Sequence, residues 1–184
     1  MFYDAELIKK LEAFQNILDQ DPPKDWIKQH PLIKDKTGKP IEYLPIDKVD
    51  WLLKKLIMRY KWEVVSTEDI LNGVKATVRL HYFHPVLSEW MFHDGVGADP
   101  YKLDQGAAKN DLSKVKSGAI QMAVPNSVTY AKKNAAKNLG RVFGQDLSRD
   151  DEDFQIVSLY ADVPKLKPEP APAAQTAAQF NGLF

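Results

Sequence analysis

The sequence predicts an α+β fold in which an antiparallel β-meander of three or more strands packs on a long basic helix. Residues 74–83 alternate between apolar and polar side chains, as expected for a strand with one buried face. Residues 47–61 and 112–143 have a helical character instead, the first with apolar residues at i, i+3, i+4 and i+7. A sheet covered by a helix accounts for both patterns.

Two helices are expected before the strands. Residues 4–19 form the first, with Asp4 as its N-cap, and the prolines at 22 and 23 end it. Residues 30–45 are expected to be a loop. Residues 47–61 form the second helix, with Asp47 as its N-cap. Its polar face is basic and is expected to be a solvated surface, carrying Lys48, Lys54, Lys55 and Arg59.

Three strands are expected to follow, over residues 62–66, 74–83 and 87–93. Asn72-Gly73 is a strong hairpin turn signal between the first two strands. In the central strand the alternation assigns one face to apolar side chains, namely Val74, Ala76, Val78, Leu80 and Tyr82. The other face then carries Lys75, Thr77, Arg79 and His81.

A long loop over residues 94–111 is expected next, and loops of that length are usually functional or mobile. Gly95 and Gly97 lie at its start, where they indicate either a weak phosphate-cradling loop or a close approach of backbones. Helical character then resumes from residue 112 to 143, with a kink or break expected at Pro125 and a C-terminal cap at Gly144.

Composition sets broad limits. The chain has 184 residues, 44% hydrophobic and 27% charged, which suits one domain over residues 1–155 and a flexible Pro/Ala-rich tail over residues 164–184. The absence of cysteine excludes disulfides, thiolate zinc sites and cysteine nucleophiles. The sequence shows no apolar run of membrane-spanning length and no secretory signal, so we expect a cytoplasmic protein without membrane contact.

Charge is distributed unevenly although its sum is zero. Residues 101–141 hold eight basic residues and two acidic ones, whereas residues 145–163 are strongly acidic. On the predicted helix, Lys133, Lys137 and Arg141 follow one another at i, i+4 and i+8, and Lys132 and Lys116 could widen the patch. A row of cations at this spacing suits the phosphates of a DNA strand, although a solvated basic face is an equal alternative on this evidence.

Aromatic side chains add to a nucleic-acid interpretation because bases stack on them without regard to sequence. Six are candidates, and most are expected in the core: Tyr43, Trp51, Trp62, Trp90, Phe92 and Tyr101. Tyr101 is expected to be exposed beside Lys102.

Bond-breaking chemistry is not expected. His81 and His84 would point to opposite faces of a strand, so no metal site is predicted there. An alternative is a metal-dependent nuclease that uses the loop aspartates, although no partner set stands out for them: Asp94, Asp99, Asp104 and Asp111.

Four blocks together resemble the single-strand annealing proteins of the Rad-fifty-two type, and most closely the short phage members of the Sak type. They are EYLPIDKVDWLL (42–53), the Asn72-Gly73 hairpin with Val78-Arg79-Leu80, HDGVGA (93–98), and VTYAKKNAAKNLGRVFG (128–144). Their order and spacing cover most of residues 40–150.

The resemblance implies a ring-forming oligomer that holds single-stranded DNA in a basic groove and anneals complementary strands without nucleotide hydrolysis or a cofactor. It places the family's helix lysine at Lys133, whereas Asn134 stands where the family has arginine. Lys132 or Lys137 could compensate, and Lys75 or Arg79 would be the basic residue of the hairpin. The implied location is the cytoplasm of a bacterial host if the chain is encoded by a phage.

Two further questions stay open at this stage. A DNA repair or end-protection protein of similar fold would bind DNA and anneal poorly, and the sequence does not separate it from an annealing protein. The tail ends in Phe180, Leu183 and Phe184. It is either a docking peptide for a host single-strand-binding protein or phage exonuclease, or a terminus without a partner.

Overall fold

A computed structural model describes residues 4–108 and 111–147. The chain divides after Arg149 into two units, and the described residues all belong to the first. The predicted domain boundary at 155, the acidic stretch beyond 147 and the predicted tail over 164–184 lie outside them. Within these residues the elements follow in this order: α1 (Ala5–Leu18), η1 (Lys24–Trp26), β1 (Lys28–Lys34), β2 (Pro40–Tyr43), α2 (Ile46–Leu52), η2 (Leu53–Ile57), β3 (Tyr60–Ile70), β4 (Gly73–His84), β5 (Glu89–Pro100), η3 (Leu112–Lys114), α3 (Ala119–Lys137) and η4 (Arg141–Phe143).

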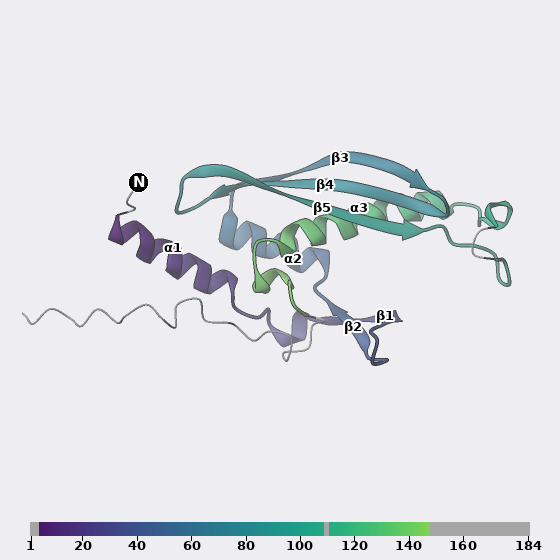
Figure 1. The fold of residues 1–184 in the computed structure, drawn as a ribbon, viewed down its shortest axis with the longest axis horizontal. Coiled ribbons are helices and arrows are strands. Elements are labelled where there is room, and N and C mark those ends of the chain that lie inside the picture. Colours follow the sequence, from purple (N-terminus) through teal and green to yellow (C-terminus); the bar gives the residue numbers. More distant parts are fainter. Residues whose placement is uncertain (1–3, 109–110, 148–184) are drawn as a thin grey trace, which may run out of the picture. The chain divides into compact units, whose positions relative to one another are not determined.

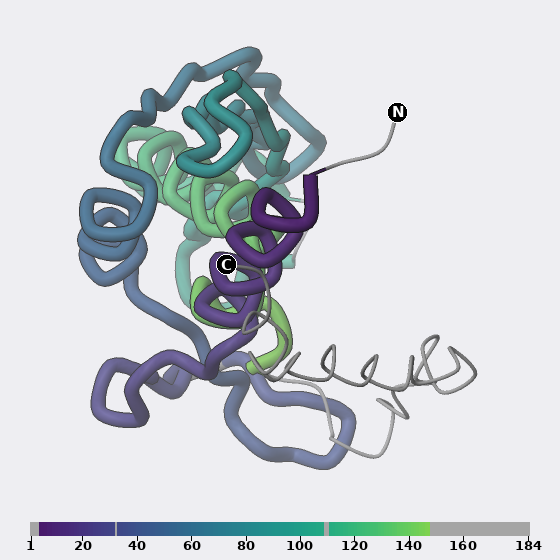
Figure 2. The backbone as a smooth tube through the Cα atoms, turned by 90° about the vertical axis from the view of Figure 1, so that its left-hand side faces the viewer, coloured from purple at the N-terminus to yellow at the C-terminus, as the bar shows by residue number. Residues whose placement is uncertain are grey.

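The predicted α+β architecture is confirmed. Strands β3, β4 and β5 form an antiparallel meander in that order, and α3 packs along one face of it against β4 and β5 (Figure 1). Both views place the helices between this sheet and a second, two-stranded sheet of β1 and β2 (Figure 2). No helix in the described part of the chain is long and apolar enough to cross a membrane.

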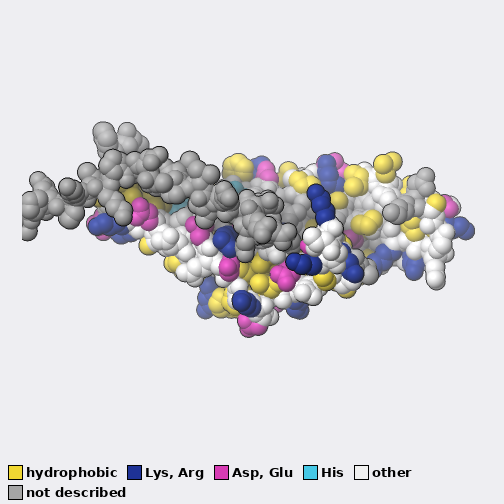
Figure 3. Space-filling view, turned by 60° about the horizontal axis from the view of Figure 1, so that its bottom comes forward, with side chains coloured by type: hydrophobic (Ala, Val, Ile, Leu, Met, Phe, Trp, Pro, Cys, Tyr) yellow, Lys and Arg dark blue, Asp and Glu magenta, His cyan; other side chains and the backbone are white. Residues whose placement is uncertain are grey.

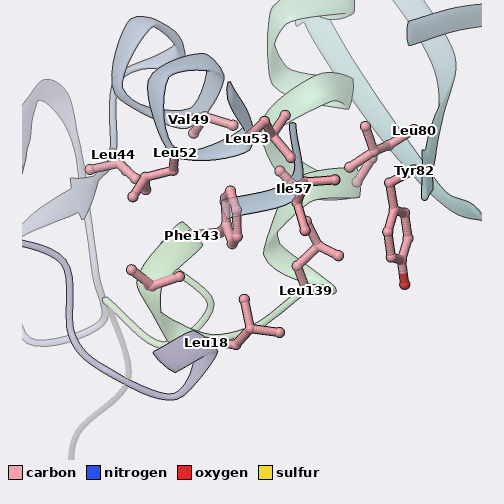
Figure 4. Packing of buried hydrophobic residues seen from close by; sticks show 13 residues of the cluster. Leu18, Leu44, Val49, Leu52, Leu53, Ile57, Leu80, Tyr82, Leu139 and Phe143 are labelled. Carbon is pink, nitrogen blue, oxygen red and sulfur yellow. The ribbon is translucent and has the colours of Figure 1, made fainter. Parts of the chain in front are cut away.

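The predicted alternation of β4 is also confirmed. Its apolar side chains are at most 4% exposed: Val74, Ala76, Val78, Leu80 and Tyr82. Leu80 and Tyr82 belong to the main core, together with residues of η2, η4 and the C-terminal end of α3 (Figure 4). Leu53 and Ile57 of η2 and Phe143 of η4 are almost fully buried there. This core fixes the C-terminal end of α3 against α2 and the sheet.

The loop predicted over residues 94–111 is wrong in its first half, because β5 continues to Pro100. Gly95 and Gly97 face α3, where an added Cβ would collide with the backbone at Ala131 and Ala135. The glycines therefore let the strand and helix backbones approach closely, and they do not form a phosphate-cradling loop. The two glycines signal tight packing in this sequence, although Gly is also the commonest residue of turns.

The region predicted as a loop over residues 30–45 contains the β1–β2 hairpin. Asp35 organises its turn, since its Oδ1 accepts hydrogen bonds from Thr37 N at 2.8 Å and Lys39 N at 2.9 Å. Gly38 has a φ of 86°, which favours glycine. Neither strand was predicted, because Pro31 and Pro40 argue against strands in the sequence.

The second helix is shorter than predicted. Helix α2 starts at Ile46 with Pro45 in the cap position, so Asp47 lies in its first turn and does not cap it. The π-helical turn η2 follows, and Met58 ends it with a φ of 62°. Tyr60 then begins β3. Tyr60 follows the helical spacing of the apolar residues before it because its side chain packs against the same core.

The long helix predicted over residues 112–143 is three elements. Helix α3 runs unbroken through Pro125, and the break falls at Gly140, where a φ of 146° and the close approach of Leu18 exclude other residues. Gly144 is a left-handed cap as predicted, but it caps η4. As a result, Arg141 does not continue the row of Lys133 and Lys137 on α3.

Helix α1 agrees with its prediction, and Asp4 accepts a hydrogen bond from Glu6 N. The hairpin turn between β3 and β4 lies one residue earlier than predicted, at Leu71-Asn72, because Ile70 pairs with Gly73. Gly73 belongs to the strand, where an added Cβ would meet the backbone of Asp99 and Pro100.

Candidate nucleic-acid interface

A cleft of about 290 Å³ lies between α3 and the β1–β2 hairpin. Its polar and aromatic lining comes from β1, β2, α3 and the residues after η4, namely His30, Glu42, Tyr43, Tyr130, Lys133, Asn134, Lys137 and Gln145. Its floor is apolar and includes Ile41, Leu44 and Phe143. The cleft thus combines two lysines, the Glu42 carboxylate, aromatic rings and an apolar base, and the lysines and rings suit a ligand with both phosphate and ring groups.

Lys133 is the central cation of this cleft. Its Nζ lies 4.7 Å from the ring centroid of Tyr43 and 4.6 Å from that of Tyr130. Burial lowers the pKa of Lys133 below the ordinary lysine value, and the nearby charge of Lys137 lowers that pKa further. A cation held by rings is positioned without being neutralised, because the ring faces carry no net charge.

The local sequence explains this arrangement. Tyr130, Lys133 and Lys137 recur at i, i+3 and i+7, which brings them to one face of α3. Tyr43 closes the opposite wall at the end of β2, and its ring lies 6.2 Å from that of His30. The helical spacing could have revealed Tyr130 from sequence, since it lies three residues before Lys133, on the same helix face. Tyr43 and His30 come from another element, so no pattern on the helix predicts them.

Asn134 and Asn138 fasten α3 to the edge of the sheet. Asn134 Nδ2 donates to Val96 O at 2.8 Å, and Asn138 Nδ2 donates to Asp94 O at 3.3 Å. Strand β5 is an edge strand, and these two carbonyl groups lie two residues apart on it. The position where the resemblance implies an arginine thus holds an amide that has a structural partner.

Lys132 lies on another flank of α3. Its Nζ is 5.6 Å from the ring centroid of Trp62 on β3, and Trp62 Nε1 donates to Asp50 at 3.1 Å. Lys132 does not line the cleft beside Lys133. It is therefore poorly placed to replace the missing arginine, whereas Lys137 lies in the cleft.

Three of the predicted cations are paired with carboxylates elsewhere. Lys75 Nζ lies 2.7 Å from Glu68, and Arg141 Nη2 lies 2.8 Å from Asp21. Arg79 donates two hydrogen bonds to Asp94, at 2.7 and 2.8 Å, and they hold the pKa of the Asp94 carboxyl below its usual value. None of these three cations lines the cleft.

The last three candidates meet at the segment after β5. Lys116 N donates to Lys102 O at 3.0 Å, and both side chains are exposed. Tyr101 is half-buried rather than exposed, and its hydroxyl donates to Asp69 at 2.7 Å. Lys133 lies fourteen residues beyond the start of α3, or about 21 Å along its axis, so this group is separate from the cleft.

On the face that carries β1 and β2, basic side chains are dispersed among apolar and acidic ones (Figure 3). Among the residues that the structure describes there is no group of three or more His, Asp or Glu side chains that could hold a metal ion. His84 Nδ1 accepts from two backbone amides, and His81 lies 2.6 Å from Glu63.

Comparison of the sequence with models of protein families found no match, and comparison with curated proteins found none either.

Proposed function

We propose that this protein binds single-stranded DNA in the cleft around Lys133 and anneals complementary strands. The observation that carries the proposal is the position of Lys133, half-buried between the rings of Tyr43 and Tyr130 with Lys137 beside it. Single-strand binders combine cations that hold the phosphates with rings on which bases stack, and this cleft contains both.

The chemistry of annealing favours this kind of site. A strand can pair with its complement only if its Watson–Crick edges stay free, so contacts to the backbone and to base faces are suitable and base-specific contacts are not. Lys133 and Lys137 would hold phosphates, and Tyr43 and Tyr130 would hold sugar or base faces. None of these groups needs a nucleotide cofactor.

The resemblance to annealing proteins of the Rad-fifty-two type supports the same function. It adds an oligomeric ring or filament, action in homologous recombination and repair, and the cytoplasm of a bacterial host. The apolar end of the tail separately motivates the proposal that it docks on a host single-strand-binding protein or a phage exonuclease. The parts drawn from the resemblance rest on residues 42–144 as a sequence pattern, and the cleft supplies an independent argument for DNA binding.

The direct test is Lys133→Ala combined with Lys137→Ala. We expect single-strand affinity to fall at least about tenfold, and the slope of log affinity against log salt to decrease by about 1.4, since each phosphate contact contributes about 0.7. Annealing of two complementary oligonucleotides should slow in parallel. Lys75→Ala is the matched control, because that lysine lies outside the cleft.

The assays also separate the other activities. If the double variant bound and annealed like the wild type, the cleft would not be the site. Binding by the wild type without annealing would indicate an end-protection protein. Cleavage of labelled DNA with magnesium or manganese, lost in Asp94→Asn, would indicate a nuclease.

A further inference from the structure

Two lysines and a tryptophan on α2 and η2 lie close to a second tryptophan, Trp26 at the end of η1. Lys48 Nζ lies 5.1 Å from the ring centroid of Trp26, and Lys55 Nζ lies 5.7 Å from that of Trp51. The two indole rings contact each other edge to face, with centroids 5.1 Å apart and planes at 84°. None of these four residues lines the cleft around Lys133.

Trp51 is unusually exposed for a tryptophan. The opposite side of α2 and η2 is buried through Val49, Leu52 and Leu53, whereas Trp51 keeps 47% of its surface exposed. Tryptophan has the largest apolar surface of any side chain, and an exposed indole leaves much of that surface in water. A ring in this state has a face available for stacking.

The charges around Trp51 favour a nucleic acid over a protein as its ligand. Lys54 and Lys55 are exposed beside it. Of the two aspartates of α2, Asp50 accepts the hydrogen bond of Trp62, and Asp47 Oδ2 lies 3.8 Å from Lys48 Nζ. Lysine is depleted in the cores of protein–protein interfaces, whereas lysines beside exposed rings are typical of single-strand binding surfaces. Phosphates complement the lysines, and bases complement the indoles.

The surface is also close to the cleft along the chain. Tyr43 and Leu44 line the cleft, and α2 begins two residues later at Ile46. Trp51 lies five residues into this helix, about 8 Å along its axis. The start of α2 is therefore adjacent to the cleft, and Trp51 lies about one and a half turns further along the helix.

We propose that Trp26, Lys48, Trp51 and Lys55 form a second stacking platform for single-stranded DNA, which extends the path of the strand beyond the cleft. This proposal rests on the proposed function, because it takes the same ligand. On this platform Trp51 stacks on a base without reading its identity, and Lys48 and Lys55 hold the neighbouring phosphates.

The test uses the full chain and a single-stranded oligothymidylate long enough to extend beyond the cleft. Trp51→Ala should weaken binding by about tenfold, which is within the range measured for loss of one base–aromatic contact. Trp51→Phe should retain most of the affinity, because a ring remains. Lys48→Ala with Lys55→Ala should lower the salt slope by about 1.4.

Two matched controls isolate the platform. Met58→Ala removes an exposed apolar side chain at the end of the same helical segment and should leave binding unchanged. DNA-induced quenching of tryptophan fluorescence should diminish in Trp51→Phe and persist in Trp90→Phe, since Trp90 is comparably exposed on β5. Denaturant unfolding confirms that the variants are folded.

The outcomes distinguish this proposal from the proposed function. Unchanged affinity and quenching in Trp51→Ala, with impaired binding in the Lys133 and Lys137 double variant, would overturn the platform alone. A change of oligomeric state in Trp51→Ala without a change in DNA affinity would show a protein contact instead. If the wild type itself failed to bind single-stranded DNA, the proposed function would fail.

Discussion

The cleft and the outer face of the sheet both contain basic residues, but they hold them in different ways. On the sheet, cations lie beside carboxylates across the strands, as Arg79 does with Asp94 and Lys75 with Glu68. In the cleft, Lys133 lies between two tyrosine rings. Carboxylates neutralise a cation, whereas rings orient it and leave its charge available to an anion. The local partner therefore affects how much of a cation's charge is available to an anion, and a count of lysines does not show this.

The largest effect is expected at the contact between β5 and α3, which positions both the cleft and the sheet. Gly95→Val places a side chain against the α3 backbone at Ala131 and Ala135, where nothing can move without separating helix and strand. We expect a loss of more than about 3 kcal/mol in the free energy of unfolding, as for severe overpacking. Urea denaturation measures it. Gly106→Ala meets open space and only the backbone strain of a φ of 82°, so it should cost about 1–2 kcal/mol. Similar losses at both positions would contradict the close packing.

Removing a ring from the cleft should have the next largest effect. Tyr43→Ala takes away one of the two rings around Lys133, and single-strand affinity should fall by about 1–3 kcal/mol, the usual value of an aromatic stacking contact. Fluorescence anisotropy with a labelled oligonucleotide measures this change. Tyr43→Phe keeps the ring and is the control. Equal losses in both variants would assign the effect to the hydroxyl and not to the ring.

The pH dependence of binding sharpens the comparison further. The pKa of Lys133 in the free protein lies below the ordinary value because of burial, and a bound phosphate favours the charged form. Affinity should therefore fall as pH rises through this lowered pKa, approaching about tenfold per pH unit for one linked proton. Oligodeoxyadenylate is suitable because its bases lose no proton in this range. Lys133→Met should bind weakly at every pH, and a wild-type-like profile in that variant would point to another group.

The smallest effect is expected on the sheet. Asp94→Asn removes the carboxylate that neutralises Arg79 and makes the sheet face more like the cleft. We expect slightly tighter DNA binding with a salt slope steeper by about 0.7, equivalent to one additional phosphate contact. Asp94→Glu keeps the charge and should leave the slope unchanged. An unchanged slope in Asp94→Asn would show that DNA does not reach this face.

The sequence predicted the parts of the fold that depend on local periodicity. The alternation of β4 identified its buried face because one side of that strand packs against α3 and η2. It failed where glycine and proline serve packing: Gly95 in β5 suggested a loop, and Gly140 was overlooked as the end of the helix. For these residues the deciding contact comes from another part of the chain, which local patterns do not contain.

The site was predictable to the same extent. Lys133 and Lys137 share a helix face, so their spacing brought them together correctly. Arg141 was placed beside them only because the helix was drawn too long, and its guanidinium lies against Asp21. Tyr43 and His30 line the cleft because the β1–β2 hairpin lies beside α3. That arrangement depends on tertiary packing, which local sequence patterns do not predict. Helical spacing thus supplied the cations of the cleft, and the tertiary fold supplied most of its rings.

The side-chain amides of Asn134 and Asn138 cover part of one edge of the sheet, at β5. An edge strand with unused carbonyl groups is a template for another strand, but two carbonyl groups of β5 are occupied by α3. A strand from another molecule could align there only by displacing both amides. Growth of this sheet by strand addition is therefore hindered at β5, because an incoming strand has to compete with α3 for the same carbonyl groups.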